Sequence, residues 1–244
     1  MMSFAQPATF SRFVGRVLPW IAVLSLAALV FALWQGLVVA PADYQQGETV
    51  RIMFLHVPSA MLALGGWTLM SIASLGVLVW RHPLADVAAQ CAAPLGAAFS
   101  AITLVTGSLW GKPMWGTWWV WDARLTSMLL LFFMYLGVIS LRGALGDQTR
   151  AAKPVAIFTL AGFINIPIVK FSVDWWNTLH QPASLLRVEG VAIHESIRNP
   201  LFYNIAAFCL LFVLLHMLLM RTELMRRRLH RLQMQAIERA EEKP

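Results

Sequence analysis

The chain alternates long apolar stretches with short segments that hold most of its charges. Crossing the hydrocarbon core of a membrane as an α-helix takes about 20 apolar residues. Two of the apolar stretches are short, but charged side chains at their ends would reach the interface by snorkelling. The pattern predicts an all-α integral membrane protein with six transmembrane helices, at about 18–40, 53–80, 88–109, 124–143, 154–172 and 199–221.

No internal repeat, low-complexity linker or separate soluble segment divides the chain. We therefore expect residues 1–244 to form a single six-span membrane domain. An even number of spans places both termini on the same side of the membrane. Residues 222–244 are rich in Leu, Met, Arg, Glu and Gln, which favour helix. This tail is predicted to continue the last span as a helix on the side of the termini.

Composition and charge support this picture and orient it. The chain is 59% hydrophobic and only 13% charged, whereas about a quarter of a soluble domain is charged. Of the 19 Lys and Arg residues, 13 fall on the side of the termini. Cytoplasmic segments carry the excess of Lys and Arg, so both termini are expected in the cytoplasm. The net charge of +7 thus reflects topology, and we expect no nucleic-acid partner.

One outer segment, residues 110–122, is unusually rich in tryptophan. It holds five of the chain's 11 tryptophans: Trp110, Trp115, Trp118, Trp119 and Trp121. An interfacial aromatic belt would account for one or two of them. Two glycines and a proline make a continuous helix unfavourable across its first half. We interpret the five side chains as a flat aromatic surface, the tryptophan platform, on which a planar apolar ligand could lie.

Three histidines are predicted on the same outer face: His56, His180 and His194. Neutral imidazole binds transition metals and haem iron. A single interfacial histidine is more often structural, but a pair flanking the tryptophan platform would place one imidazole on each face of a planar macrocycle. His216, inside the last span, is expected to be a hydrogen-bonded residue of the bundle. Cys91 and Cys209 are isolated, which excludes a C-x-x-C-H haem attachment site.

The residues from Trp110 to Thr126, WGKPMWGTWWVWDARLT, resemble the tryptophan-rich signature of the WWD family, the haem-handling proteins of cytochrome c maturation. Similarity extends to APADYQQG (40–47), LHVP (55–58) and WWNTLHQ (175–181). With the chain length and the six spans, these motifs resemble the heme exporter protein C (CcmC) group of that family. The resemblance covers the chain from about Trp20 to Met220.

The resemblance implies a function and a site. Such proteins hold b-type, non-covalently bound haem at the periplasmic face of the bacterial inner membrane and transfer it to the haem chaperone CcmE. Their further partners are the small membrane protein CcmD and the ABC transporter subunits CcmA and CcmB. They are haem-handling proteins and not enzymes, although they promote covalent attachment of haem to the chaperone. The family's axial ligands fall on His56 and His180, and its haem-binding segment on the tryptophan platform and Asp122; His194 matches no ligand position.

The sequence does not decide the roles of Asp122 and of the cationic residues near the site. Asp122 could orient a ligand, pair with Arg124, or cap the fourth span. The haem propionates need cationic partners, for which the sequence offers Arg51, Lys112, Arg124 and Arg187.

Three other functions remain as alternatives. A purely structural subunit is one of them, but it would give no reason for the tryptophan platform. A transporter subunit exporting haem or another small molecule would carry polar groups near the membrane midplane, where His216, Asn165 and Lys170 are few and scattered. A b-type electron-transfer protein would need more histidines on its spans.

Overall fold

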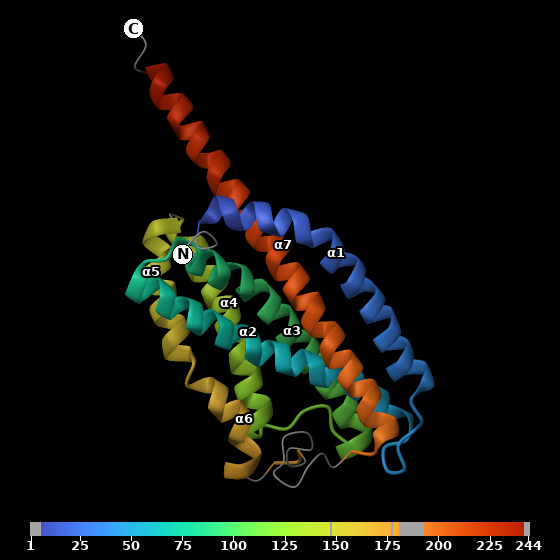
Figure 1. Cartoon of the computed structure of the whole chain (residues 1–244). Helices are drawn as coiled ribbons and strands as arrows, with labels where there is room; N and C mark the ends of the chain where they lie inside the picture. The colour runs from blue at the N-terminus through green and yellow to red at the C-terminus, as the bar shows by residue number, and fades with distance from the viewer. Residues whose placement is uncertain (1–5, 147, 177, 181–192, 242–244) are drawn as a thin grey trace.

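The computed structural model describes residues 6–146, 148–176, 178–180 and 193–241, and this part of the chain is helical apart from short connections (Figure 1). The α-helices are α1 (Pro7–Trp34), α2 (Met53–Trp80), α3 (Pro83–Trp115), α4 (Ala123–Leu145), α5 (Gln148–Gly162), α6 (Asn165–Trp175) and α7 (Glu195–Glu241). Six helical stretches are long and apolar enough to cross a membrane: Pro7–Val39, Glu48–Trp80, Pro83–Trp115, Ala123–Leu145, Arg150–Trp175 and Glu195–Ala240. The predicted fold class, an all-α protein with six spans, is confirmed.

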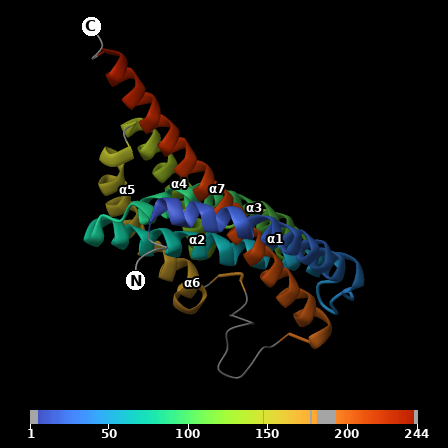
Figure 2. The ribbon, with the colours of Figure 1, turned by 45° about the horizontal axis from the view of Figure 1, so that its top comes forward.

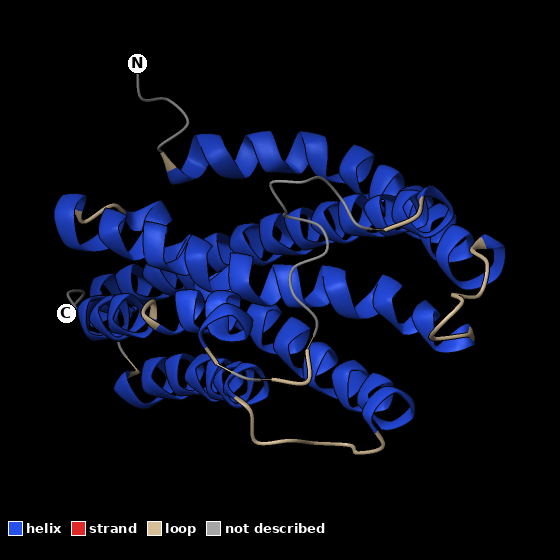
Figure 3. Ribbon diagram, turned by 90° about the horizontal axis from the view of Figure 1, so that it is seen from below, coloured by secondary structure: helices blue, strands red, loops and turns tan. Residues whose placement is uncertain are grey.

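The helices form a bundle around α2 and α3. Helix α1 packs along α7, while α5 and α6 cover α2 and α4 (Figures 1 and 2). The start of α1 and the end of α7 lie toward one end of the bundle, which we call the tail end (Figure 1). The connections 40–47 and 116–122 and residues 178–180 gather at the opposite end, the site end, seen from below in Figure 3.

The core is fixed by two fully buried aromatic residues, Trp67 of α2 and Tyr135 of α4. Their ring centroids are 4.9 Å apart, edge to face. Trp67 donates its indole N–H to the carbonyl of Thr159 at 3.1 Å, and the Tyr135 hydroxyl donates to the carbonyl of Ala63 at 2.7 Å. A side chain at Gly96 would overlap the Tyr135 ring, so this glycine is what lets α3 approach α4 closely. These contacts bind four helices into one core.

The fifth span is divided into two helices, where one had been predicted for 154–172. Helix α5 ends at Gly162 and α6 begins at Asn165. Pro167 falls in the first turn of α6, where its missing N–H is tolerated. The Asn165 side chain donates to the carbonyl of Ser127 at 2.9 Å and so ties the break to α4. Proline and this side-chain bond together account for the interruption.

The expectation that the first half of residues 110–122 avoids helix is wrong, because α3 continues to Trp115. Pro113 removes only one helical hydrogen bond near the helix end. Gly111 is buried against the Trp115 ring, where a Cβ would lie 3.2 Å from Cε3. The helix stops at Gly116, whose φ of 76° is accessible to glycine. Trp110 and Trp115 are therefore held on a helix, and only the later tryptophans lie on a loop.

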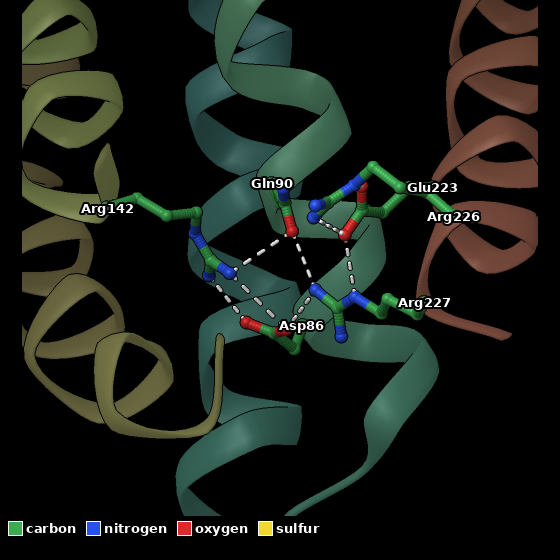
Figure 4. Close-up of polar contacts among 6 residues, drawn as sticks. All are labelled: Asp86, Gln90, Arg142, Glu223, Arg226 and Arg227. Carbon is green, nitrogen blue, oxygen red and sulfur yellow. Dashed lines mark hydrogen bonds and ion pairs between the residues drawn. The ribbon is translucent and has the colours of Figure 1, made fainter. Parts of the chain in front are cut away.

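Near the tail end, a cluster of buried charges joins three helices (Figure 4). Asp86 of α3 pairs with Arg142 of α4 at 2.5 Å and with Arg227 of α7 at 2.7 Å. Gln90 accepts hydrogen bonds from both arginines, and Glu223 pairs with Arg227 at 2.7 Å. Asp86 and Arg142 are only 6% and 9% exposed. The cluster holds α7 against α3 and α4 at the height of Glu223.

Beyond this ionic cluster, α7 continues as an exposed helix. Its 47 residues give a length of about 70 Å at 1.5 Å per residue. The side chains of residues 228–240 are exposed. The prediction that the last span extends as a helical tail is borne out up to Glu241.

Candidate functional site

The loop between the first two spans builds one wall of the site end. Asp43 accepts hydrogen bonds from the backbone N–H groups of Gln45 and Gln46 at 2.9 Å, and Gly47 has a φ of 57°. This tight turn directs the Gln46 side chain toward α3, where it accepts the indole N–H of Trp110 at 3.0 Å. Arg51 fastens the loop to the π-helical segment Gln35–Val39, which follows α1, by donating to the carbonyl of Leu37 at 2.6 Å. Trp110 is thereby fixed in orientation.

His56 lies in the first turns of α2 and faces α3. Its Nδ1 is 3.0 Å from the Thr106 hydroxyl, and its ring centroid is 5.6 Å from that of Trp110. Thr106 already donates its hydroxyl proton to the carbonyl of Ile102 at 2.6 Å, so it accepts from Nδ1–H of the imidazole. A Cβ at Gly107 would lie 3.1 Å from His56 Cε1, which shows how closely the ring approaches this helix. In this tautomer the lone pair of the ring lies on Nε2.

His180 is oriented by Asp122. One carboxylate oxygen of Asp122 accepts the N–H of Leu125 at 2.7 Å and caps α4, and the other lies 3.2 Å from His180 Nδ1. The sequence left these roles as alternatives, and the structure assigns both to the same side chain. The His180 ring meets Trp115 edge to face at 4.8 Å. Since a carboxylate only accepts, His180 carries its proton on Nδ1 and presents Nε2.

His180 is neutral at ordinary pH. Burial lowers the pKa of its imidazole below the usual 6.5, Asp122 opposes this shift, and Arg124 adds to it. The neutral ring is the form that coordinates a metal.

Both histidines contact aromatic residues in the last turns of α3: His56 contacts Trp110, and His180 contacts Trp115. Arg124 is held by the Ser172 hydroxyl at 3.4 Å and by the carbonyl of Lys170 at 3.3 Å. The structure therefore gathers two imidazoles, two indoles and one guanidinium at the site end.

The other predicted tryptophans occupy the outer part of the platform. Trp118 and Trp121 are 55% and 74% exposed, and Trp119 stacks edge to face on Trp121 at 5.5 Å. Lys112 lies 5.9 Å from the centroid of Trp118. Among the described residues, the indole N–H of Trp119 is buried without a hydrogen-bond acceptor. The platform thus has an inner part against the histidines and an exposed outer part.

The remaining histidines have structural partners. His194 is exposed, and its Nδ1 bonds the Ser196 hydroxyl at 2.9 Å at the start of α7. His216 Nε2 bonds the carbonyl of Ala88 at 2.9 Å, as expected for a residue of the bundle. Arg187 and Gln181 lie outside the described residues.

Sequence reasoning missed Thr106, Gly107 and Gln46. Each acts through a residue that was singled out, either His56 or Trp110. The Thr-Gly pair one turn before Trp110 was the only available signal.

The fold and this site define a multi-pass helical membrane protein that presents two histidines beside tryptophan rings at one end of its bundle. Comparison with known proteins identifies the family within this class of membrane proteins. The chain belongs to the heme exporter protein C (CcmC) family, whose sequence model matches residues 1–235.

Individual relatives agree with this assignment. The heme exporter protein C of Bradyrhizobium diazoefficiens is 57% identical over 234 residues, covering 96% of this chain and 89% of the relative. The protein of the same name from Escherichia coli K12 is 45% identical over 217 residues, 89% of this chain and 87% of the relative. A ccmC-like mitochondrial protein of Marchantia polymorpha, named for cytochrome c biosynthesis, is 50% identical over 185 residues, 76% of each chain.

Proposed function

We propose that this protein binds haem at the periplasmic end of its bundle and transfers it to the haem chaperone CcmE during c-type cytochrome biogenesis. The observation that carries the proposal is the pair His56 and His180. In both rings Nδ1 is engaged by a neighbouring side chain, Thr106 for His56 and Asp122 for His180, so Nε2 is the nitrogen that we assign to the iron. The names of the relatives, which specify heme export and cytochrome c biosynthesis, support the choice of cargo.

The residues present suit haem as a cargo. A porphyrin supplies four nitrogen ligands to its iron, so two imidazoles complete six-coordination. Trp110 and Trp115 would cover apolar porphyrin surface, which contributes about 25 cal/mol per Å² removed from water. Of the four cationic candidates, we assign Arg124 to the propionates because it lies two residues after Asp122, the hydrogen-bond partner of His180. The indole N–H of Trp119 offers a buried donor for a carboxylate.

Binding of this kind serves storage and delivery. Two axial imidazoles leave no open position for oxygen, so the arrangement suits handling of haem and not turnover. The haem would be b-type and non-covalently bound. The exposed Trp118 and Trp121 leave the outer platform accessible to a partner. We assign this surface to CcmE, with CcmD and the transporter subunits CcmA and CcmB in the same assembly.

The polar groups within the spans argue against a solute pathway through the bundle. His216 and Asn165 are bonded to backbone carbonyls of neighbouring helices.

The proposed orientation predicts opposite labelling of the two ends. In a Cys91→Ala/Cys209→Ala background, a cysteine replacing Tyr44, which is 90% exposed, should react with an impermeant maleimide in spheroplasts of the bacterium. A cysteine replacing the exposed Arg231 should react only after the membrane is opened. The reason is the excess of Lys and Arg at the tail end, which favours the cytoplasm. Labelling of the Arg231→Cys variant in intact spheroplasts would reverse the orientation and remove the periplasmic haem site.

Single tryptophan variants of the outer platform should separate binding from delivery. Trp118→Ala and Trp121→Ala remove exposed contacts and leave the histidines in place, so haem should be retained with an unchanged axial spectrum. Loading of CcmE should fall, because the partner approaches the same exposed rings. Haem content and chaperone loading are measured in one membrane preparation. Trp20→Ala, an exposed tryptophan of α1, is the matched control. Normal loading in both platform variants would leave Trp118 and Trp121 with an interfacial anchoring role only.

A further inference from the structure

The two histidines of the site have hydrogen-bond partners of different charge. His180 Nδ1 lies 3.2 Å from the carboxylate of Asp122, whereas His56 Nδ1 lies 3.0 Å from the neutral hydroxyl of Thr106. The Asp122 side chain is 4% exposed, so water screens its charge little. Thr106 donates its only hydroxyl proton to the carbonyl of Ile102, so its oxygen accepts the hydrogen bond from the imidazole. The two ligand positions are therefore unequal.

This difference affects how strongly each imidazole donates to iron. A carboxylate that accepts Nδ1–H draws the proton toward itself, gives the ring imidazolate character and raises the basicity of Nε2. Hydrogen bonds with an ionised partner are roughly twice as strong as neutral ones. A threonine hydroxyl orients the ring and adds little electron density. His180 is consequently the stronger donor, and His56 the weaker one.

The two histidines also differ in where they lie in the fold. His56 belongs to α2, whose first turns pack against α3 at Thr106 and Gly107. His180 lies in the connection after α6, outside the spans. Release of the haem requires both bonds to iron to break, and the bond to His56 is the one that ties the cargo to the spans.

We propose that His180 is the anchoring ligand and His56 the exchangeable one, with Thr106 as the positioning residue that keeps the His56 ring in place. This inference rests on the proposed function. At handover the bond between iron and His56 Nε2 breaks first; the electron pair stays on Nε2, the proton stays on Nδ1, and no redox change is needed. His180, backed by Asp122, then holds the cargo alone.

Carbon monoxide tests which ligand leaves. In the reduced, haem-loaded protein, CO replaces the weaker axial ligand, and its C–O stretching frequency reports the basicity of the imidazole that remains. We expect Asp122→Asn to raise this frequency and Thr106→Val to leave it unchanged. Asparagine is also a good N-cap, so Asp122→Asn keeps the start of α4. Thr106→Val should instead raise the apparent CO affinity by about tenfold, the lower limit for losing an outer-shell partner.

A matched control and the opposing outcomes are available in the same protein. Thr68 of α2 makes the same helical bond as Thr106, to the carbonyl of Leu64 at 2.9 Å, so Thr68→Val should change neither quantity. A frequency that responds to Thr106→Val and not to Asp122→Asn would make His180 the exchangeable ligand. Equal responses, or no CO binding at all, would show that the ligands are equivalent and overturn the inference. Absence of a two-imidazole spectrum in the unmodified protein would defeat the proposed function itself.

Discussion

Haem retention should fall sharply when His180 is replaced by alanine. Loss of an outer-shell partner already costs about 10–100-fold in metal affinity, and loss of the ligand itself should cost at least as much. His56→Ala should also change the axial spectrum, with a smaller loss of bound haem, because the carboxylate-backed ligand remains. Haem per protein and the optical and electron paramagnetic spectra of the purified variants measure both effects.

His194→Ala is the control for this experiment. His194 is exposed and bonded to Ser196 at the start of α7, so its removal should leave haem content and spectrum unchanged. Unchanged spectra in both the His56 and His180 variants would eliminate the two-histidine site.

Asp86→Asn should destabilise the bundle strongly. Asp86 is the shared partner of Arg142 and Arg227, and the substitution removes the carboxylate charge that pairs with both guanidinium groups. Removing one partner of a buried ion pair costs about 3–5 kcal/mol. The lower part of that range applies, because Arg227 is 21% exposed and partly screened by water. Thermal unfolding in detergent, followed by tryptophan fluorescence, measures the loss.

Two further variants isolate the cause. Arg231→Gln changes an exposed charge of the same α7 helix and should shift stability by about 0.5 kcal/mol at most. The double variant Asp86→Asn/Arg142→Met removes both buried charges and should recover part of the stability lost in Asp86→Asn. If the single and double variants unfold alike, the ionic cluster contributes little to holding α7.

The sequence was most informative where a pattern depends on local chemistry. The apolar stretches predicted the six spans, since crossing a membrane sets a minimum length that the residues themselves reveal. Residue type and place around the tryptophan platform left three candidate histidines, His56, His180 and His194, and the resemblance to the WWD family selected the first two. Asp122 was singled out as well, but capping α4 and orienting a ligand were treated as alternative roles. The sequence does not show that the two oxygens of one carboxylate face different partners.

What the sequence did not reveal depends on contacts between distant segments. Thr106 is a routine helical threonine until α2 brings His56 to within 3.0 Å of it, 50 residues away in the chain. Gly111 and Pro113 suggested the end of a helix. In the fold, Gly111 instead makes room for the Trp115 ring, and α3 runs on to Trp115. The break before Asn165 likewise depends on a bond to Ser127 in another helix.

The double role of Asp122 has a consequence for the order in which the protein is made. During synthesis, His56, the tryptophans from Trp110 to Trp121 and the whole of α4 precede residue 180, so they enter the membrane before the second ligand exists. A buried carboxylate waiting without a partner would be costly. Asp122 avoids this, because the backbone of Leu125 already engages one of its oxygens as soon as α4 forms. One oxygen of Asp122 thus has a partner before residue 180 is made, and His180 then engages the other oxygen.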